Sequence, residues 1–128
     1  MSGAAAEPCV YLAGQLLTPL PPAGLAAALR GAGVEAEARE SSLCTGGVYV
    51  SLCAGEVFFT LEHVEHAEHL ARADADDAGP LRAVASRVSA ALARLGIRHR
   101  FELYDRTDEL MTYLHHAWPW DPADGAGP

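Results

Sequence analysis

The order of apolar and polar residues along the chain predicts short strands separated by helices. Residues 9–17 are mostly apolar, with β-branched and aromatic side chains, and Pro19 follows closely, as expected for a first strand. Residues 23–30 are rich in Ala and Leu and are followed by a glycine, which predicts a helix. Residues 34–39 then alternate apolar and charged side chains, so we expect a half-buried strand there.

The middle of the chain carries the clearest local signal, a hairpin with its turn at Ala54-Gly55. Apolar residues occupy every second position before and after the turn, at Val48, Val50 and Leu52 and then at Val57, Phe59 and Leu61. From Pro80 onwards, apolar side chains lie three and four positions apart, which predicts an amphipathic helix closed by Gly96. Residues 97–104 alternate again and predict a further strand.

A last helix is predicted to begin at Thr107, because Asp108 and Glu109 follow this capping residue and suit the helix dipole. The segments give the order β-α-β-β-β-(α)-α-β-α. The fold class we expect is α+β: an antiparallel-rich sheet with helices packed on one face, in a ferredoxin-like or split βαβ arrangement with additions. We expect a single domain over residues 9–120, with flexible termini at residues 1–8 and 121–128.

Composition changes this picture by excluding classes of function. The chain has 128 residues, 50% of them hydrophobic, and a formal net charge of −8. It is too apolar for a disordered protein, lacks an apolar run long enough to span a membrane, and is too acidic for general nucleic-acid binding. All nine basic residues are arginine, which indicates a GC-rich and bacterial coding sequence. Three cysteines without a secretory signal favour the cytoplasm.

The charge is distributed unevenly along the chain. Residues 1–79 hold three arginines and eleven acids, residues 80–106 hold six arginines and two acids, and residues 107–128 hold four acids without an arginine. The net charges of the three segments are therefore −8, +4 and −4. The arginines of the middle segment either pair with the acidic remainder or form part of a surface that docks a charged partner.

Tryptophan and arginine are the residues most enriched at binding hot spots, and both gather in the C-terminal third of the chain. The residues predicted to bind a partner are Arg87, Arg94, Arg98, Arg100, Trp118 and Trp120. The competing interpretation is that the tryptophans fold back onto the core as a lid.

Residues 62–69 repeat Glu-His-x and hold three of the six histidines. On a helix, Glu62 and His66 would form an i, i+4 pair with the acid first, so a solvated, salt-bridged helix is the main interpretation. The alternative is a site for zinc or another transition metal, with the ligands drawn from His63, His66, His69 and His116.

We expect a small acidic protein that acts by protein–protein binding, as an immunity or antitoxin-like protein or an accessory factor. The partner is unidentified, a homodimer is an open alternative, and no cofactor or catalytic group is predicted.

A lone loop cysteine, Cys44, would need a histidine base to act as a nucleophile. One alternative function is histidine-based metal binding or sensing. Another is a small-molecule binder or cyclase-like enzyme, with a pocket lined by Tyr49, Phe58, His99 and Tyr104.

Overall fold

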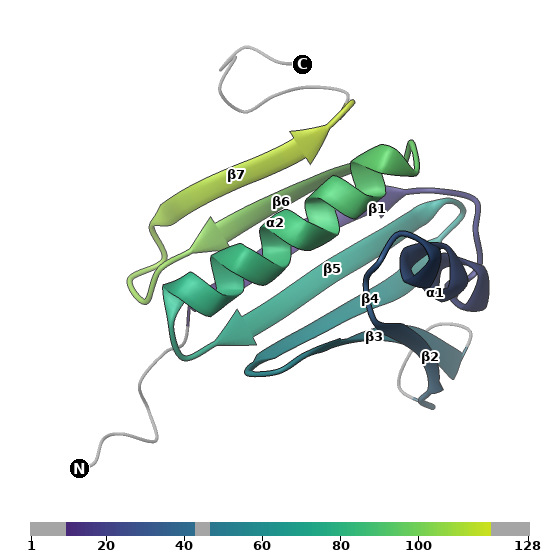
Figure 1. Cartoon of the computed structure of the whole chain (residues 1–128), viewed down its shortest axis with the longest axis horizontal. Coiled ribbons are helices and arrows are strands. Elements are labelled where there is room, and N and C mark those ends of the chain that lie inside the picture. Colours follow the sequence, from purple (N-terminus) through teal and green to yellow (C-terminus); the bar gives the residue numbers. More distant parts are fainter. Residues whose placement is uncertain (1–9, 43–46, 119–128) are drawn as a thin grey trace.

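The computed structural model describes residues 10–42 and 47–118 (Figure 1). Its elements are β1 (Val10–Leu17), α1 (Pro22–Gly31), β2 (Ala36–Glu40), β3 (Val48–Ala54), β4 (Val57–Glu65), β5 (Glu68–Ala75), α2 (Ala78–Arg94), β6 (Arg98–Tyr104) and β7 (Leu110–His116). The strands form a 7-stranded sheet in the order β2-β3-β4-β5-β1-β6-β7, and every neighbouring pair is antiparallel. The predicted mixed α+β class with an antiparallel sheet is therefore confirmed.

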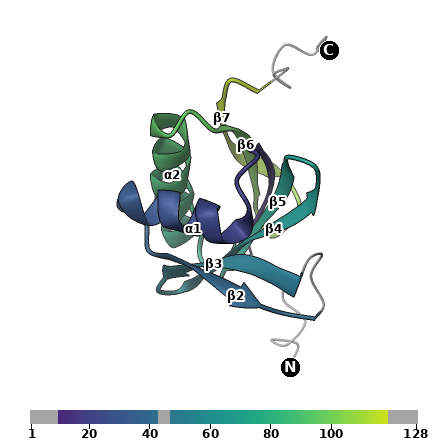
Figure 2. The same cartoon turned by 90° about the vertical axis from the view of Figure 1, so that its right-hand side faces the viewer.

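The sheet has a buried face and an exposed face. Side chains alternate between them along each strand, so that Leu12 and Leu16 of β1 are buried while Ala13 is exposed. The helix α2 contacts β1, β4, β5, β6 and β7, and α1 contacts β2, β3 and β4. Figure 2 gives a second view of α1, α2 and the strands that they contact. No helix in the described part of the chain is long and apolar enough to cross a membrane.

The central strand β1 carries a glycine where the sheet has no room for a side chain. Gly14 lies on the buried face, opposite Ala71 of β5 and Phe101 of β6. A Cβ atom at this position would lie 2.7 Å from Cδ1 of Phe101 and closer still to the carbonyl oxygen of Arg100. Glycine therefore lets the Phe101 ring, which is fully buried, lie across β1.

The predicted helix over residues 62–69 is wrong, because this segment is a β-hairpin. Strand β4 runs to Glu65, β5 begins at Glu68, and His66 forms the turn with a φ of 49°. From His69 onwards the buried positions are every second residue, at His69, Ala71, Ala73 and Ala75. This period of two is the strand signal, and it is weak in the sequence because alanine is only slightly apolar.

The predicted C-terminal helix is wrong as well, because Leu110–His116 forms β7 along β6. Thr107 does not cap a helix. Instead, the carboxylate of Asp105 accepts hydrogen bonds from the backbone and hydroxyl of Thr107 and from the backbone of Glu109. These bonds hold a tight turn in which Asp108 has a φ of 66°.

The other predicted elements are confirmed within a few residues. They are the first strand, the helix after Pro22, the strand near residue 36, the hairpin at Gly55, the helix after Pro80 and the strand before Asp105. The predictions for residues 1–8 and 121–128, for Cys44 and for Trp120 concern residues outside the described ranges.

Candidate functional site

The exposed face of the sheet carries most of the described aromatic side chains. The cross-strand register places five of them there: Tyr11, Tyr49, Phe58, Tyr104 and Tyr113. Phe59 and Phe101, by contrast, lie on the buried face. Phe58 is 63% exposed, and the rings of Tyr11 and Tyr104 stack with their centroids 5.1 Å apart. These rings therefore lie on the face away from the core, where Phe58 is exposed and the four tyrosines are half-buried.

A chain of hydrogen bonds crosses three strands of this face. Nε of Arg100 donates to Oε1 of Gln15 at 2.9 Å, and Nε2 of Gln15 donates to Oε2 of Glu68 at 2.7 Å. On the other side, Nη1 of Arg100 lies 3.5 Å from Oε2 of Glu102. The hydroxyl of Tyr104 donates to Oε1 of Glu102 at 2.7 Å. The carboxylate acceptor, helped by partial burial, raises the pKa of Tyr104 to about 12, so the hydroxyl remains a donor at neutral pH.

Trp118 lies over the guanidinium group of Arg100. The central carbon of that group is 5.5 Å from the centroid of the indole ring, which is within the range of a cation–π contact. The chain bends at Ala117, which has a φ of 52°. We call Gln15, Glu68, Arg100, Glu102, Tyr104 and Trp118 the Arg100–Trp118 cluster.

A hollow of about 210 Å³ lies beside this cluster, lined by Ala13, Gly14, Gln15, Leu70, Arg100 and Glu102. Its position follows from the small side chain of Ala13, which lies between Tyr11 and Gln15 on the exposed face of β1. The hollow therefore offers an apolar floor next to hydrogen-bonding groups that are already held in place.

Only some of the predicted partner-binding residues come together. Arg98, Arg100 and Trp118 lie on the exposed face, whereas Arg87 and Arg94 lie on α2. Nη2 of Arg94 donates to the carbonyl oxygen of Ala32 at 2.7 Å, which ties α2 to the end of α1. Arg94 therefore has a structural contact on the other side of the sheet.

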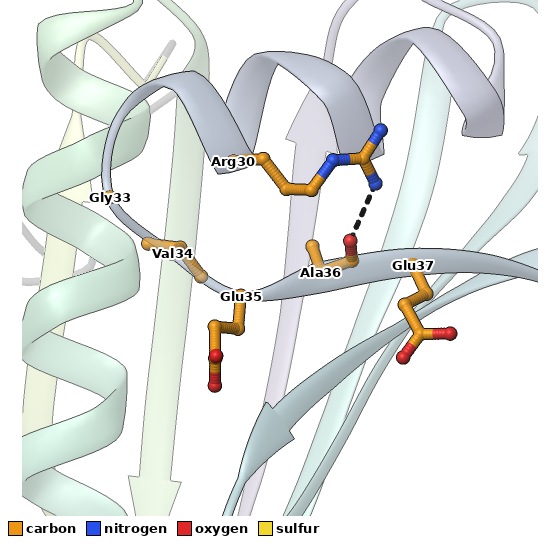
Figure 3. A pocket seen from close by; sticks show the side chains of 6 residues that line it. All are labelled: Arg30, Gly33, Val34, Glu35, Ala36 and Glu37. Atoms are coloured by element: carbon orange, nitrogen blue, oxygen red, sulfur yellow. Dashed lines mark hydrogen bonds between the residues drawn. The ribbon is translucent and has the colours of Figure 1, made fainter.

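A second cavity, of about 460 Å³, lies where α1 meets β2 and is lined by residues 30 and 33–37 (Figure 3). Nη1 of Arg30 donates to the carbonyl oxygen of Ala36 at 2.7 Å. Figure 3 shows the side chains of Glu35 and Glu37 pointing away from Arg30. These charged groups do not converge on one point, so the cavity has no arrangement suited to catalysis.

The histidines form two pairs on the buried side of the sheet. The rings of His63 and His69 lie 5.1 Å apart, and those of His99 and His116 lie 6.2 Å apart. Leu16 of β1 lies between the pairs, because it is paired with both His69 and His99. The four predicted metal ligands are therefore divided, with His63 and His69 in one pair and His116 in the other.

His66 joins neither pair, because its side chain is exposed in the turn after β4. Its carbonyl oxygen accepts a hydrogen bond of 2.7 Å from Nε2 of His63. Within the described ranges, no group of three or more His, Cys, Asp or Glu side chains is arranged to hold a metal ion.

The two fully buried histidines have different surroundings. His99 is satisfied, because its Nδ1 donates to the carbonyl oxygen of Ile97 at 3.0 Å and its Nε2 accepts from the hydroxyl of Ser89 at 2.7 Å. His69 is 1% exposed, and its ring nitrogens make no well-formed hydrogen bond within the described residues, although the backbone of Thr18 and Leu20 lies close enough to raise its pKa in part. Burial lowers the pKa of both imidazoles, and neighbouring histidines lower it further.

The four residues predicted to line a small-molecule pocket do not meet. Tyr49, Phe58 and Tyr104 lie on the exposed face, whereas His99 lies on the buried face. The alternation in residues 97–104 already separated His99 from Tyr104, since residues of opposite parity in a strand face opposite sides.

The sequence reasoning missed Gln15, Glu68 and Glu102 as members of the site. Arg100, Glu102 and Tyr104 occupy alternate positions of one strand, so the sequence places them on the same face. Gln15 and Glu68 join them only through the pairing of β1 with β5 and β6. Comparison of the chain with protein-family models, curated proteins and solved structures finds no match.

Proposed function

We propose that this protein binds another protein through the exposed face of its sheet, centred on the Arg100–Trp118 cluster. The observation that carries this proposal is the contact of Trp118 with Arg100 on a face where five further aromatic rings lie. Tryptophan, tyrosine and arginine dominate binding hot spots, because they contribute a large contact area together with hydrogen-bonding groups.

The hydrogen bonds of Arg100 support this role. Gln15, Glu102 and Trp118 hold its guanidinium in one place, so a partner would lose little side-chain entropy on contacting it. The charges of Arg100 and Glu102 already offset each other. Recognition would therefore depend on shape and hydrogen bonds as much as on net charge.

We also propose a more specific fold, a cellular location and a class of protein. The inner strand order β4-β5-β1-β6, with α2 joining two strands that flank β1, supports a ferredoxin-like or split βαβ arrangement with helices packed on one face. Strands β2, β3 and β7 would be additions to it. The charge and cysteine content favour a cytoplasmic protein of the immunity, antitoxin or accessory class.

Affinity capture tests the binding proposal. The tagged full chain is exposed to a lysate of the organism that encodes it, beside the variants Arg100→Ala and Trp118→Ala. Each variant should reduce capture of a specific protein by about tenfold or more, as hot-spot truncations do. Arg39→Ala is the matched control, because Arg39 is an exposed arginine on the far edge strand β2.

The variants must keep the urea unfolding midpoint of the wild type, so that lost capture reflects the surface rather than the fold. The binding proposal fails if Arg100→Ala and Trp118→Ala capture the same proteins in the same amounts as Arg39→Ala. Capture that depends instead on Arg87 would move the binding surface to α2.

A second candidate function is transition-metal binding by the His63–His69 pair. The supporting observation is that the ring nitrogens of His69 make no well-formed hydrogen bond within the described residues, and that a second imidazole lies 5.1 Å away. The bond from Nε2 of His63 to a backbone carbonyl is the kind that orients a ligating imidazole.

Calorimetric titration with zinc or nickel tests the metal-binding proposal, with His69→Leu expected to abolish binding and His116→Ala to leave it unchanged. Equal heats for the wild type and His69→Leu would exclude this site.

A further inference from the structure

The two edge strands of the sheet differ in charge. Strand β2 is five residues long and carries Glu37, Arg39 and Glu40, and the first two form an ion pair of 3.6 Å. Strand β7 is seven residues long and contains no Asp, Glu, Arg or Lys. Natural sheets protect their edges with short strands, charged side chains and β-bulges. Strand β2 has the first two of these features, whereas β7 has only a register shift between Thr112 and Leu110.

Strand β7 also exposes apolar surface. Leu110 is 54% exposed and is one of three large apolar side chains in the described residues with such exposure, the others being Phe58 and Leu95. β7 is the last strand in the sheet order, so its outer side faces no other strand of the described chain. This combination is what a sheet edge that pairs with a further strand requires.

The charges near the two ends of β7 have opposite signs. The turn before its first residue carries Asp105, Asp108 and Glu109 against a single arginine, Arg106. The other end lies beside the start of β6, where Arg98 and Arg100 lie on the exposed face. Glu102 offsets part of the Arg100 charge, so Arg98 contributes most of the positive charge at this end.

On the buried side, α2 contributes one more positive group to the middle of β7. Nε of Arg82 donates to the hydroxyl of Thr112 at 3.1 Å. The strand itself is uncharged, with an acidic turn before it, Arg98 and Arg100 of β6 near its other end, and Arg82 of α2 against its middle.

We propose that β7 is the contact between two copies of this chain, paired antiparallel about a two-fold axis. Antiparallel pairing places the acidic start of one β7 beside the basic end of the other, so the charges are complementary on both sides of the axis. With the axis at Tyr113, Thr112 lies opposite Leu114 of the second copy. The register shift between Thr112 and Leu110 places Leu110 near His116 of the second copy rather than directly opposite it. Each sheet would thus continue into the other, and both exposed faces would remain available to a partner.

The charges near the two ends of β7 determine how a charged residue at position 110 should affect pairing of the two copies. A lysine there would stand at the basic end of the other copy, so it would be repelled and would also protect the edge. A glutamate would remove the same apolar contact but would face the arginines favourably. The proposal therefore predicts that Leu110→Lys weakens pairing more than Leu110→Glu does.

Sedimentation velocity on the full chain, over about two orders of magnitude in concentration, measures this pairing. The wild type should approach twice the monomer mass of 13.5 kDa as concentration rises. Leu110→Lys should raise the dimer dissociation constant by about tenfold or more, and Leu110→Glu by a smaller factor. Leu95→Lys is the control, because Leu95 is an exposed leucine at the end of α2.

Two results would overturn the proposal. One is a wild type that stays monomeric over the whole concentration range. The other is a dimer that Leu110→Lys and Leu95→Lys leave equally strong, which would place the contact elsewhere. Because Leu110 lies outside the Arg100–Trp118 cluster, loss of the dimer and loss of partner capture can be told apart.

Discussion

His69 and His99 are both buried on the same face of the sheet, yet within the described residues only His99 makes well-formed hydrogen bonds with its ring nitrogens. A buried polar atom without a partner loses its water and gains nothing in return, whereas a satisfied imidazole contributes to stability. Removing the hydrogen-bond donor of His99 should therefore lower the unfolding free energy, whereas replacing the ring of His69 by an apolar side chain should not lower it.

Ser89→Ala should destabilise the protein by about 1–3 kcal/mol, because Nε2 of His99 would remain buried without its donor. Urea unfolding at pH 7.5, where His99 is neutral, measures the change. Ser86→Ala is the control, since Ser86 is an exposed serine on the same helix. Equal unfolding free energies for the two variants would show that the Ser89–His99 bond contributes nothing.

The lowered pKa values of His69 and His99 make the protein sensitive to acid. In the unfolded chain an imidazole takes up a proton below about pH 6.5, but burial delays this uptake in the folded protein. The unfolded state therefore binds more protons, and the unfolding free energy should fall as the pH drops from 6.5 towards the folded pKa values. Well above pH 6.5 these two groups are neutral in both states and contribute no slope.

His69→Leu isolates one of these contributions. The variant should be at least as stable as the wild type at pH 7.5, because a leucine has no ring nitrogens to leave unsatisfied. It should also lose stability less steeply between pH 6.5 and pH 5 (about the range set by the imidazole pKa). A profile parallel to that of the wild type would mean that His69 is already protonated or solvated in the folded protein.

At the scale of the elements, the sequence predicts those segments whose apolar residues are large and regularly spaced. Leu81, Val84 and Val88 define α2, and the strand of Phe101 and Leu103 is equally clear. Strand β5 is not, because its buried positions are mostly alanine, which suits helix and strand patterns alike.

Two turns explain why helices were wrongly predicted over residues 62–69 and after Thr107. Neither the turn at His66 nor the turn at Asp108 contains glycine, although both residues have a positive φ. A turn without glycine gives little warning in a sequence. The site was predictable only in part for a related reason: Arg100 and Trp118 stand out by residue type, but Gln15 and Glu68 reach Arg100 only through strand register.

The close passage of Phe101 across Gly14 gives a prediction for the pairing of β1 with β6. Gly14→Ala should cost about 1–3 kcal/mol, because a Cβ would lie 2.7 Å from the Phe101 ring and close to backbone. Gly31→Ala should be neutral or slightly stabilising, since it ends α1 with nothing within 4 Å of the added atom. Thermal unfolding of both variants makes the comparison, and a Gly14→Ala protein as stable as the wild type would contradict it.

For the molecule as a whole, the structure divides the basic segment 80–106 between two surfaces. Arg87 and Arg94 lie on α2, whereas Arg98 and Arg100 project from the exposed face of β6. The net charge of +4 over this segment is therefore not one patch. In the proposed dimer, the arginines at the start of β6 would be the ones that face the acids of the turn before β7 in the second copy.

Hydrogen exchange should reflect the strand order. Strand β1 pairs on both sides, with β5 and β6, and carries the fully buried Leu16, so its amides can exchange only when most of the sheet opens. We expect β1 to be the slowest strand to exchange and β2 to be among the fastest, because β2 is a short edge strand. Exchange followed by mass spectrometry measures both.

Amide exchange of the other edge strand, β7, tests the proposed dimer, because it depends on whether a second copy of the chain covers β7. In dilute solution β7 should exchange about as fast as β2, since each has a strand on one side only. If two copies pair through β7, its protection should rise with protein concentration while that of β2 stays constant. Leu110→Lys should remove the rise in β7 protection without affecting β1. If β7 is as strongly protected as β1 at every concentration, then β7 is not an open edge in solution. If the protection of β2 and β7 rises together with concentration, then the chain associates without a preferred edge.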